Sequence, residues 1–222
     1  MSEPEDEPDL DLAYSIETPD DSRSLYARWA ATYDENFIEK HAYVYHENVV
    51  GLFLDAGGSA GGVVLDVGCG TGVVGVALGD VGEKIVDGVD ISPEMLDVAR
   101  GKLTVHGQPA YRNLIEADLT QTVPIGDDTY SGIISVGAFT HGHLGPEAID
   151  ELVRIAAPSA VCAIGINAKH YAEFGFDRWF ASRSTEGGVT SPQLVNVSIY
   201  EAGKSEHSGE RAEVAVFQVL AS

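Results

Sequence analysis

The chain has 222 residues, of which 35 are acidic and 13 basic, so its formal net charge is −22. This length suits one α/β domain with a substantial core and a short extension. Such an acidic surface repels phosphate backbones and anionic lipids, so neither nucleic acid nor a membrane is expected as a partner. Two cysteines, Cys69 and Cys162, provide no disulfide framework, and the expected setting is therefore the reducing cytoplasm.

The N-terminal part divides into two segments. Residues 1–21 are acidic, contain prolines and have little to bury, so a mostly disordered tail is expected there. From Ser22 the pattern is helical, with Leu25, Trp29 and Phe37 among the residues that recur at three- and four-residue spacing. A second helix is expected over 42–55. This aromatic face precedes the first strand, so it is either a lid over a site or ordinary core packing.

Residues 63–75 form the most informative stretch. An apolar, β-branched run ends in a turn with glycines at 68, 70 and 72, and another apolar run follows at once. The pattern predicts a buried strand, a tight loop and a helix whose free N–H groups face the loop. The functional interpretation is a nucleotide-type cofactor site, and the alternative is an ordinary glycine-rich turn.

The remainder of the chain alternates between predicted strands and helices. Strands are expected at 85–89, 114–117, 130–136, 160–166, 194–201 and 213–220, and helices at 93–105, 147–157 and 171–181. This order implies right-handed βαβ units and a mainly parallel sheet. The last two strands have no room for a helix between them, so one of the seven strands must be antiparallel.

Two acidic residues, together with the lack of a second glycine-rich nucleotide half in the sequence, favour one cofactor over another. The G-x-G-x-x-G pattern from Gly70, with Asp90 twenty residues later, also suits a nicotinamide cofactor. However, Asp66 lies inside the first strand, where a buried carboxylate needs a hydrogen bond or a cation such as an amino acid's ammonium. Asp118 follows the third strand and suits the amino group of adenine. A ligand with an amino-acid end, a ribose and an adenine but no pyrophosphate is S-adenosylmethionine (SAM).

The same segments resemble motifs of class I SAM-dependent methyltransferases. Residues 64–72 resemble motif I, residues 88–95 resemble motif II, and residues 116–119 resemble motif III. The similarity covers about 22–222, and implies a Rossmann-like seven-stranded sheet of order 3-2-1-4-5-7-6 with strand seven antiparallel. One domain is therefore expected, with a helical lid at 22–57 and the core at 63–222.

Two further segments resemble narrower groups. Residues 26–34 resemble the Tyr-x-x-Trp-Ala-x-x-Tyr-Asp opening of several small-molecule methyltransferases, in which an N-terminal helix closes over SAM. Residues 139–148 resemble the Williams–Beuren-region methyltransferase-like proteins.

The resemblance implies roles for particular residues. Asp66 would hold the network around the amino group, Asp90 would accept both ribose hydroxyls, and Asp118 would bind the adenine edge. Tyr33 becomes a candidate for binding the SAM carboxylate. The full expected set for cofactor binding is Trp29, Tyr33, Asp66, Gly68, Cys69, Gly70, Gly72, Asp90, Ile91, Met95, Asp118, Leu119 and Val136. No metal site is expected.

The expected activity is methyl transfer from SAM to a small-molecule acceptor, which leaves S-adenosyl-L-homocysteine (SAH). His141 and His143 follow the fourth strand and are candidates for the general base, the alternative being a turn cap or a surface position. The sequence at 135–139 lacks the Pro-Pro motif of amide- and adenine-methylating enzymes. A nicotinamide-dependent oxidoreductase and a non-catalytic SAM-binding regulator are the alternatives, and both a monomer and a homodimer are left open.

Overall fold

The computed structural model describes residues 8–58, 61–82, 85–140 and 142–221. The described residues form a seven-stranded sheet of order β3-β2-β1-β4-β5-β7-β6. The strands are β1 (Val63–Val67), β2 (Ile85–Asp90), β3 (Asn113–Glu116), β4 (Tyr130–Phe139), β5 (Ala156–Asn167), β6 (Gln193–Ser198) and β7 (Arg211–Gln218). Strands β1 to β5 pair in parallel, and β7 is antiparallel to both of its neighbours. The predicted fold, strand order and antiparallel strand are confirmed.

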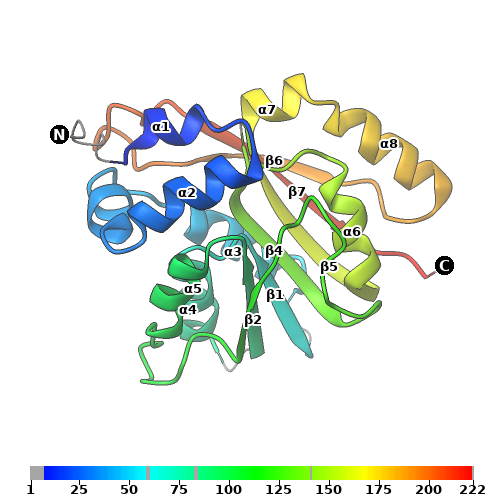
Figure 1. Ribbon diagram of the computed structural model, residues 1–222. Coiled ribbons are helices and arrows are strands. Elements are labelled where there is room, and N and C mark those ends of the chain that lie inside the picture. Colours follow the sequence, from blue (N-terminus) through cyan, green and yellow to red (C-terminus); the bar gives the residue numbers. More distant parts are fainter. Residues whose placement is uncertain (1–7, 59–60, 83–84, 141, 222) are drawn as a thin grey trace.

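Helices cover both faces of the sheet (Figure 1). The first face carries α3 (Tyr45–Asp55), α4 (Val73–Asp80) and α5 (Pro93–Arg100), and the second carries α6 (Ala148–Ile155), α7 (Ala168–Glu173) and α8 (Phe176–Glu186). Successive side chains of a strand point to opposite faces. Accordingly Val64 packs into the core under α3 to α5, whereas Leu65 and Val67 pack into the core under α6 and α8.

The N-terminal segment forms a cover beside the sheet, made of α1 (Leu10–Tyr14), α2 (Pro19–Trp29) and the π-helix η1 (Asp34–Glu39). Helices α1 and α2 lie side by side in Figure 1. Thr18 caps α2 in a capping box with Asp21, which satisfies the first free N–H groups of the helix. The expected second helix begins at Tyr45, three residues later than predicted.

The prediction of disorder over 1–21 is wrong for residues 8–21. Asp9 caps α1 through a hydrogen bond to the backbone N–H of Leu12. Leu10, Ala13 and Ile16 are buried in the same core cluster as the aromatic residues of α2. The acidic composition favoured a prediction of disorder, although the segment contains these three apolar residues. Their burial offsets the conformational entropy lost when the segment becomes ordered. Residues 1–7 of the expected tail lie outside the described residues.

Within the described part of the chain, every helix is too short or too polar to cross a lipid bilayer.

Candidate functional site

The loop between β1 and α4 turns sharply through glycines in the left-handed region. Gly68 has φ 67° and Gly70 has φ 51°, values that residues with a side chain rarely adopt. A Cβ on Gly68 would also lie 2.6 Å from Cβ of Ala138, whereas the space beside Gly70 is open for 4 Å. The loop therefore presents bare backbone to the space beyond the carboxyl ends of the strands.

Asp90 ends β2 and holds this loop in place. Its Oδ2 accepts a hydrogen bond of 2.8 Å from the backbone N–H of Gly70, and its Oδ1 accepts one of 2.9 Å from the N–H of Ser92. Burial raises the pKa of Asp90, and these backbone hydrogen bonds oppose the rise. Each carboxylate oxygen keeps a further lone pair that can accept a hydrogen bond from a ligand hydroxyl.

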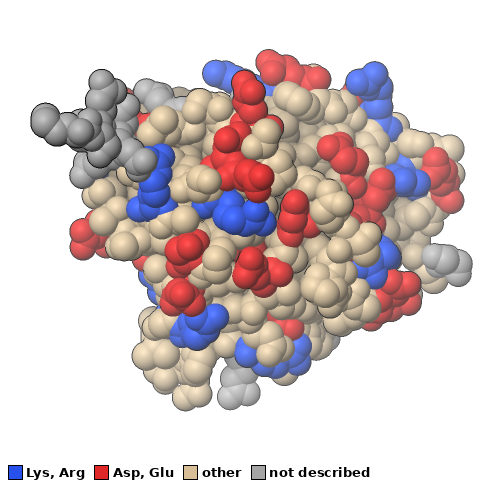
Figure 2. All heavy atoms as spheres, in the orientation of Figure 1, with Lys and Arg blue, Asp and Glu red and all other residues tan. Residues whose placement is uncertain are grey.

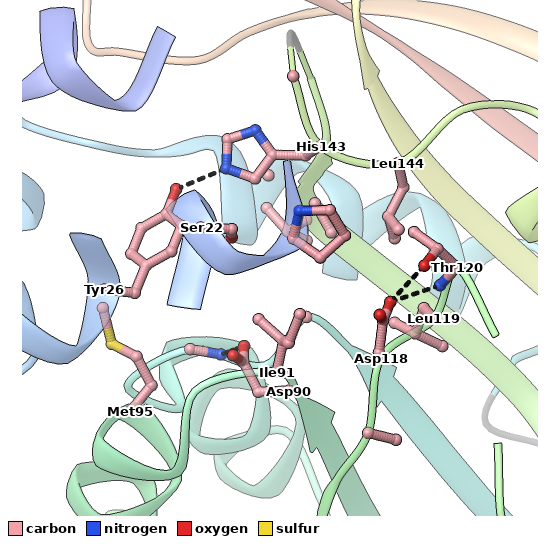
Figure 3. Close-up of a pocket in the computed structure, with 18 of the residues that line it drawn as sticks. Ser22, Tyr26, Asp90, Ile91, Met95, Asp118, Leu119, Thr120, His143 and Leu144 are labelled. Atoms are coloured by element: carbon pink, nitrogen blue, oxygen red, sulfur yellow. Dashed lines mark hydrogen bonds between the residues drawn. The ribbon is translucent and has the colours of Figure 1, made fainter. Parts of the chain in front are cut away.

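Asp90 and the glycine loop border a cavity of about 840 Å³, a volume that includes its open mouth. Figure 3 shows Asp90, Ile91 and Met95 on one side of it, with Tyr26 and His143 opposite. Ten residues expected at the site line this cavity: Tyr33, Gly68, Gly70, Asp90, Ile91, Met95, Asp118, Leu119, Val136 and His143. The segments after β1, β2, β3 and β4 thus converge with the cover on one space.

Asp118 is the polar group at the far end of the cavity. Its Oδ1 accepts hydrogen bonds from the backbone N–H and the hydroxyl of Thr120, at 2.8 and 2.7 Å (Figure 3). Oδ2 accepts no hydrogen bond from another described residue and is available to a ligand. Leu119, which is 7% exposed, supplies an apolar surface next to it.

Four expected residues do not line this cavity: Trp29, Asp66, Cys69 and Gly72. The fully buried Asp66 accepts a hydrogen bond of 2.6 Å from the hydroxyl of Tyr111, and burial raises its pKa to about 7. Its Oδ1 has no partner among the described residues, so a contact with the amino group of a cofactor would need a bridging group such as a water. The role expected for Asp66, holding the network around the amino group, therefore stays a prediction that would depend on such a bridge.

The other three residues pack against other parts of the protein and do not line this cavity. A Cβ on Gly72 would lie 3.2 Å from Cβ of Ala99, so close packing with α5 restricts this position. Cys69 is 4% exposed and packs behind the loop, where burial raises the pKa of its thiol. Trp29 lines a second, adjoining cavity. His141, one of the two expected bases, lies outside the described residues.

The cover closes over the cavity through side chains that the sequence did not single out for this role. The hydroxyl of Tyr26 lies 3.1 Å from Nε2 of His143, and this contact joins α2 to the loop after β4 (Figure 3). A Cβ on Gly142 would lie 1.6 Å from the carbonyl oxygen of Ile16, so the cover and this loop pack closely. Ser22 and Tyr43 also line the cavity. For Tyr26 the available signals were its helical spacing and its place at the start of segment 26–34, whereas the sequence analysis offered none for Ser22 or Tyr43.

A second contact fixes the cover to the glycine loop. Oδ1 of Asp34, the first residue of η1, accepts a hydrogen bond of 2.6 Å from Oγ1 of Thr71. Its Oδ2 pairs with Lys102. The loop and the cover are thus connected directly beside Gly70.

Comparisons with known proteins place this geometry in a family. A methyltransferase-domain family matches residues 64–159. Human methyltransferase-like protein 27 is 30% identical over 185 residues, which are 78% of this chain and 73% of that protein. The chain belongs to this family of class I SAM-dependent methyltransferases. The methyltransferase uses SAM as its cofactor, and this assignment replaces the nicotinamide-dependent alternative.

One further relative bears on the methyl acceptor, and one solved structure shares the fold. The 18S rRNA (guanine-N(7))-methyltransferase bud23 of Schizosaccharomyces pombe is 36% identical over 85 residues, which are 38% of this chain but 29% of that protein. A putative methyltransferase solved in complex with the Haloferax volcanii Trm112 methyltransferase activator has a TM-score of 0.58 and 18% identity, over 86% of this chain and 96% of that chain.

These matches correct the expected partners of the methyltransferase. The exclusion of nucleic acid was wrong, because the relatives that match part of this chain include an rRNA methyltransferase. The structural neighbour was solved with a protein activator, which is a property of that protein. Net charge is a property of the whole surface, whereas the acceptor is selected by local chemistry beside the methyl group.

Proposed function

We propose that this methyltransferase binds SAM between the glycine loop and the cover, and methylates an acceptor group that approaches from the side of Gly137 and His143. The observation that carries the proposal is the buried carboxylate of Asp90, which borders the cavity beside the open space at Gly70. A carboxylate held by two backbone N–H groups is positioned to accept hydrogen bonds from the two ribose hydroxyls.

The rest of the cavity suits the other parts of this cofactor. Asp118 and Leu119 offer a hydrogen-bond acceptor and an apolar surface for the adenine, and Ile91 and Met95 add to that surface. Neither Lys nor Arg is among the described residues that line the cavity, as expected for a cofactor without a pyrophosphate. Bound SAM supplies a methyl group on a sulfonium, and its transfer leaves a neutral thioether.

His143 is the proposed base for an acceptor that must lose a proton. It lies across the cavity from Asp90 in Figure 3 and is oriented by Tyr26. Burial and the charge of Asp90 raise the pKa of Tyr26, so its phenol stays protonated at neutral pH. The acceptor's lone pair forms the bond to the methyl carbon as the carbon–sulfur bond breaks. The proton of an O–H or N–H acceptor then passes to the imidazole of His143.

The acceptor we favour is a compact group that can enter an enclosed space. A free small molecule meets this condition, and so does a single nucleobase presented by an RNA. On the face shown in Figure 2, acidic and basic side chains are interspersed. The assay must therefore supply both sources of acceptor.

The binding test is calorimetric titration of the protein with SAH. We expect Asp90→Ala to weaken binding about tenfold or more, because both ribose hydrogen bonds are lost. The control is Asp97→Ala on α5, whose carboxyl is exposed and should leave the affinity unchanged. Thermal unfolding monitors the fold, and Asp90→Asn is the milder variant should the alanine variant not fold. Absence of SAH binding to the wild-type protein would refute the proposal.

The acceptor test uses SAM with a labelled methyl group. One arm contains a cell-metabolite extract and the other contains total RNA, each with wild-type protein and with Asp90→Ala. Labelled product from the wild-type protein in either arm identifies the source of the acceptor. Product in neither arm would favour a non-catalytic SAM-binding role and would contradict the proposed methyl transfer.

A further inference from the structure

The cofactor cavity adjoins a second cavity of about 560 Å³ that lies under the cover. We propose that this second cavity is the acceptor site, and that it selects an uncharged, flat aromatic or apolar group. The inference rests on the function proposed above, because it assumes that the methyl donor occupies the first cavity.

The position of the second cavity relative to the first supports this assignment. Tyr26, Tyr33, Tyr43, Gly137 and His143 line both cavities, so the two spaces meet at these side chains. They include the base proposed above. An acceptor in the second cavity would therefore face the first cavity at the junction where His143 can take its proton.

The junction itself depends on Gly137 in β4. Its φ of 83° lies in the left-handed region, and a Cβ there would be 3.3 Å from the hydroxyl of Tyr43. The absence of a side chain leaves the Tyr43 hydroxyl close to the backbone between the two cavities. Burial raises the pKa of Tyr43 well above its usual range, so the phenol keeps its proton and is a hydrogen-bond donor.

The lining indicates the chemical class of the acceptor. Eight of the residues around the second cavity are Phe, Tyr or Trp, and Asp, Glu, Lys and Arg are absent from its described lining. Aromatic walls bind flat apolar groups through offset stacking and edge contacts. A carboxylate or phosphate would lose its hydration without gaining a cationic partner, within a protein of net charge −22.

A few polar groups can fix the orientation of such an acceptor. The Tyr43 hydroxyl makes no hydrogen bond to another described residue and can donate one to an oxygen or nitrogen of the acceptor. Asn167 also lines the cavity. Its Oδ1 caps α7 through the N–H groups of Lys169 and His170 at 3.0 and 3.3 Å, and its Nδ2 is left to donate.

The cover supplies the outer wall of the cavity. Leu10 and Ala13 of α1 line the second cavity and not the first, so changes there can alter the acceptor site without touching the cofactor site. Tyr14 anchors this wall, because its hydroxyl donates a hydrogen bond of 2.5 Å to Oε2 of Glu210 in the segment between β6 and β7.

The test uses two probes with the same ring system, 2-naphthol and 2-naphthoate, and protein saturated with SAH. Ligand-observed NMR and calorimetry should show that 2-naphthol binds, and that the anionic 2-naphthoate binds about tenfold or more weakly. Equal affinity for the two probes would overturn the assignment of an uncharged acceptor. Loss of SAH binding itself would instead be a failure of the proposed function.

Two variants locate the probe. Ala13→Trp fills the second cavity and should weaken 2-naphthol binding about tenfold or more at unchanged SAH affinity. The control is Val105→Trp, which adds the same ring at a position that is 74% exposed. Should Ala13→Trp not fold, Thr140→Phe adds a ring from the half-buried rim. Unchanged 2-naphthol binding in a folded, SAH-binding variant would place the probe elsewhere and refute the inference.

Discussion

The hydroxyl of Tyr111 donates a hydrogen bond of 2.6 Å to Oδ2 of Asp66, across 45 positions of the chain. The same hydroxyl accepts a hydrogen bond of 3.0 Å from the backbone N–H of Gly75. A Cβ on Gly75 would lie 2.3 Å from the Tyr111 ring, and one on Gly72 would lie 2.9 Å from it. The ring therefore fills the space behind the cofactor loop, and these two glycines are needed for its packing.

This burial makes the stability of the fold depend on the protonation of Asp66. The folded-state pKa is about 7, against 3.8 for the free side chain, so the folded protein binds this proton more tightly than the unfolded chain. The stabilisation is complete below about pH 3.8 and is lost as the pH rises through about 7. We expect Asp66→Asn, which mimics the protonated carboxyl, to be more stable than wild type above neutral pH by roughly 4 kcal/mol.

Urea unfolding of both proteins between about pH 4 and pH 8 measures this difference. The difference should shrink toward the acidic end, where the wild-type carboxyl is itself protonated. Tyr111→Phe is the companion variant. It removes a hydrogen bond that favours the charged carboxylate, so the pKa of Asp66 should rise. The pH at which the stabilisation is lost should therefore move higher. A pH-independent difference would contradict the raised pKa of Asp66.

The contact between Asp34 and Thr71 should keep the cover closed on the cofactor. We expect Asp34→Ala to weaken SAH binding roughly fivefold, because a hydrogen bond to a charged group stabilises by about 1 kcal/mol or more. Asp34→Asn can still accept the Thr71 hydrogen bond and should give an intermediate affinity.

Calorimetry gives the affinities, and hydrogen exchange of residues 19–39 reports the opening of the cover. Asp20→Ala is the matched control, because Asp20 lies on the cover with its side chain 91% exposed. Wild-type affinity and wild-type exchange in Asp34→Ala would show that this contact does not hold the cover.

Because Tyr26 is paired with His143, changes to either side chain should slow methyl transfer and leave the binding of SAH nearly unchanged. For an acceptor that must lose a proton, His143→Gln should slow methyl transfer by about a hundredfold, while Tyr26→Phe should slow it by less than about tenfold. Transfer of labelled methyl to the acceptor found in the extract or RNA arm measures both rates. SAH affinity should stay within about threefold of wild type. A wild-type rate in His143→Gln would rule this histidine out as the base.

Asp87 should matter for stability and not for the cofactor. It is 2% exposed and accepts hydrogen bonds from Arg112 at 2.7 Å and from the hydroxyl of Tyr130 at 3.1 Å, which connect β2, β3 and β4. Asp87→Ala leaves these donors unpaired, so we expect a loss of about 2–4 kcal/mol in the free energy of unfolding.

The SAH affinity of Asp87→Ala should stay within about twofold of wild type, because this side chain does not line the cavity. Asp97→Ala, an exposed acidic residue on α5, should change the free energy of unfolding by less than about 0.5 kcal/mol. A loss of SAH binding in Asp87→Ala at temperatures where the protein is folded would contradict the separation of the two roles.

Much of the fold could be predicted because its signals are local. The apolar run before Gly68 and the glycine spacing specified β1 and its loop. Strands β2 and β3 end within one residue of the positions expected from Asp90 and Asp118. The segment 8–21 was misjudged because its charges outnumber the three apolar residues that the fold buries. Composition measures the average character of a segment, whereas burial depends on what lies opposite it.

The sequence alone was enough to predict the cofactor loop, the acidic site residues after the neighbouring strands and, through the motifs that they form, the methyltransferase sheet. Short-range periodicity and glycine conformations carry that information. Two features became visible only in the folded protein: Asp66 pairs with Tyr111, and α1 closes a second, aromatic cavity beside the first. These contacts join residues far apart in the chain, so their partners are set by how the helices, the loops and the cover pack on the sheet.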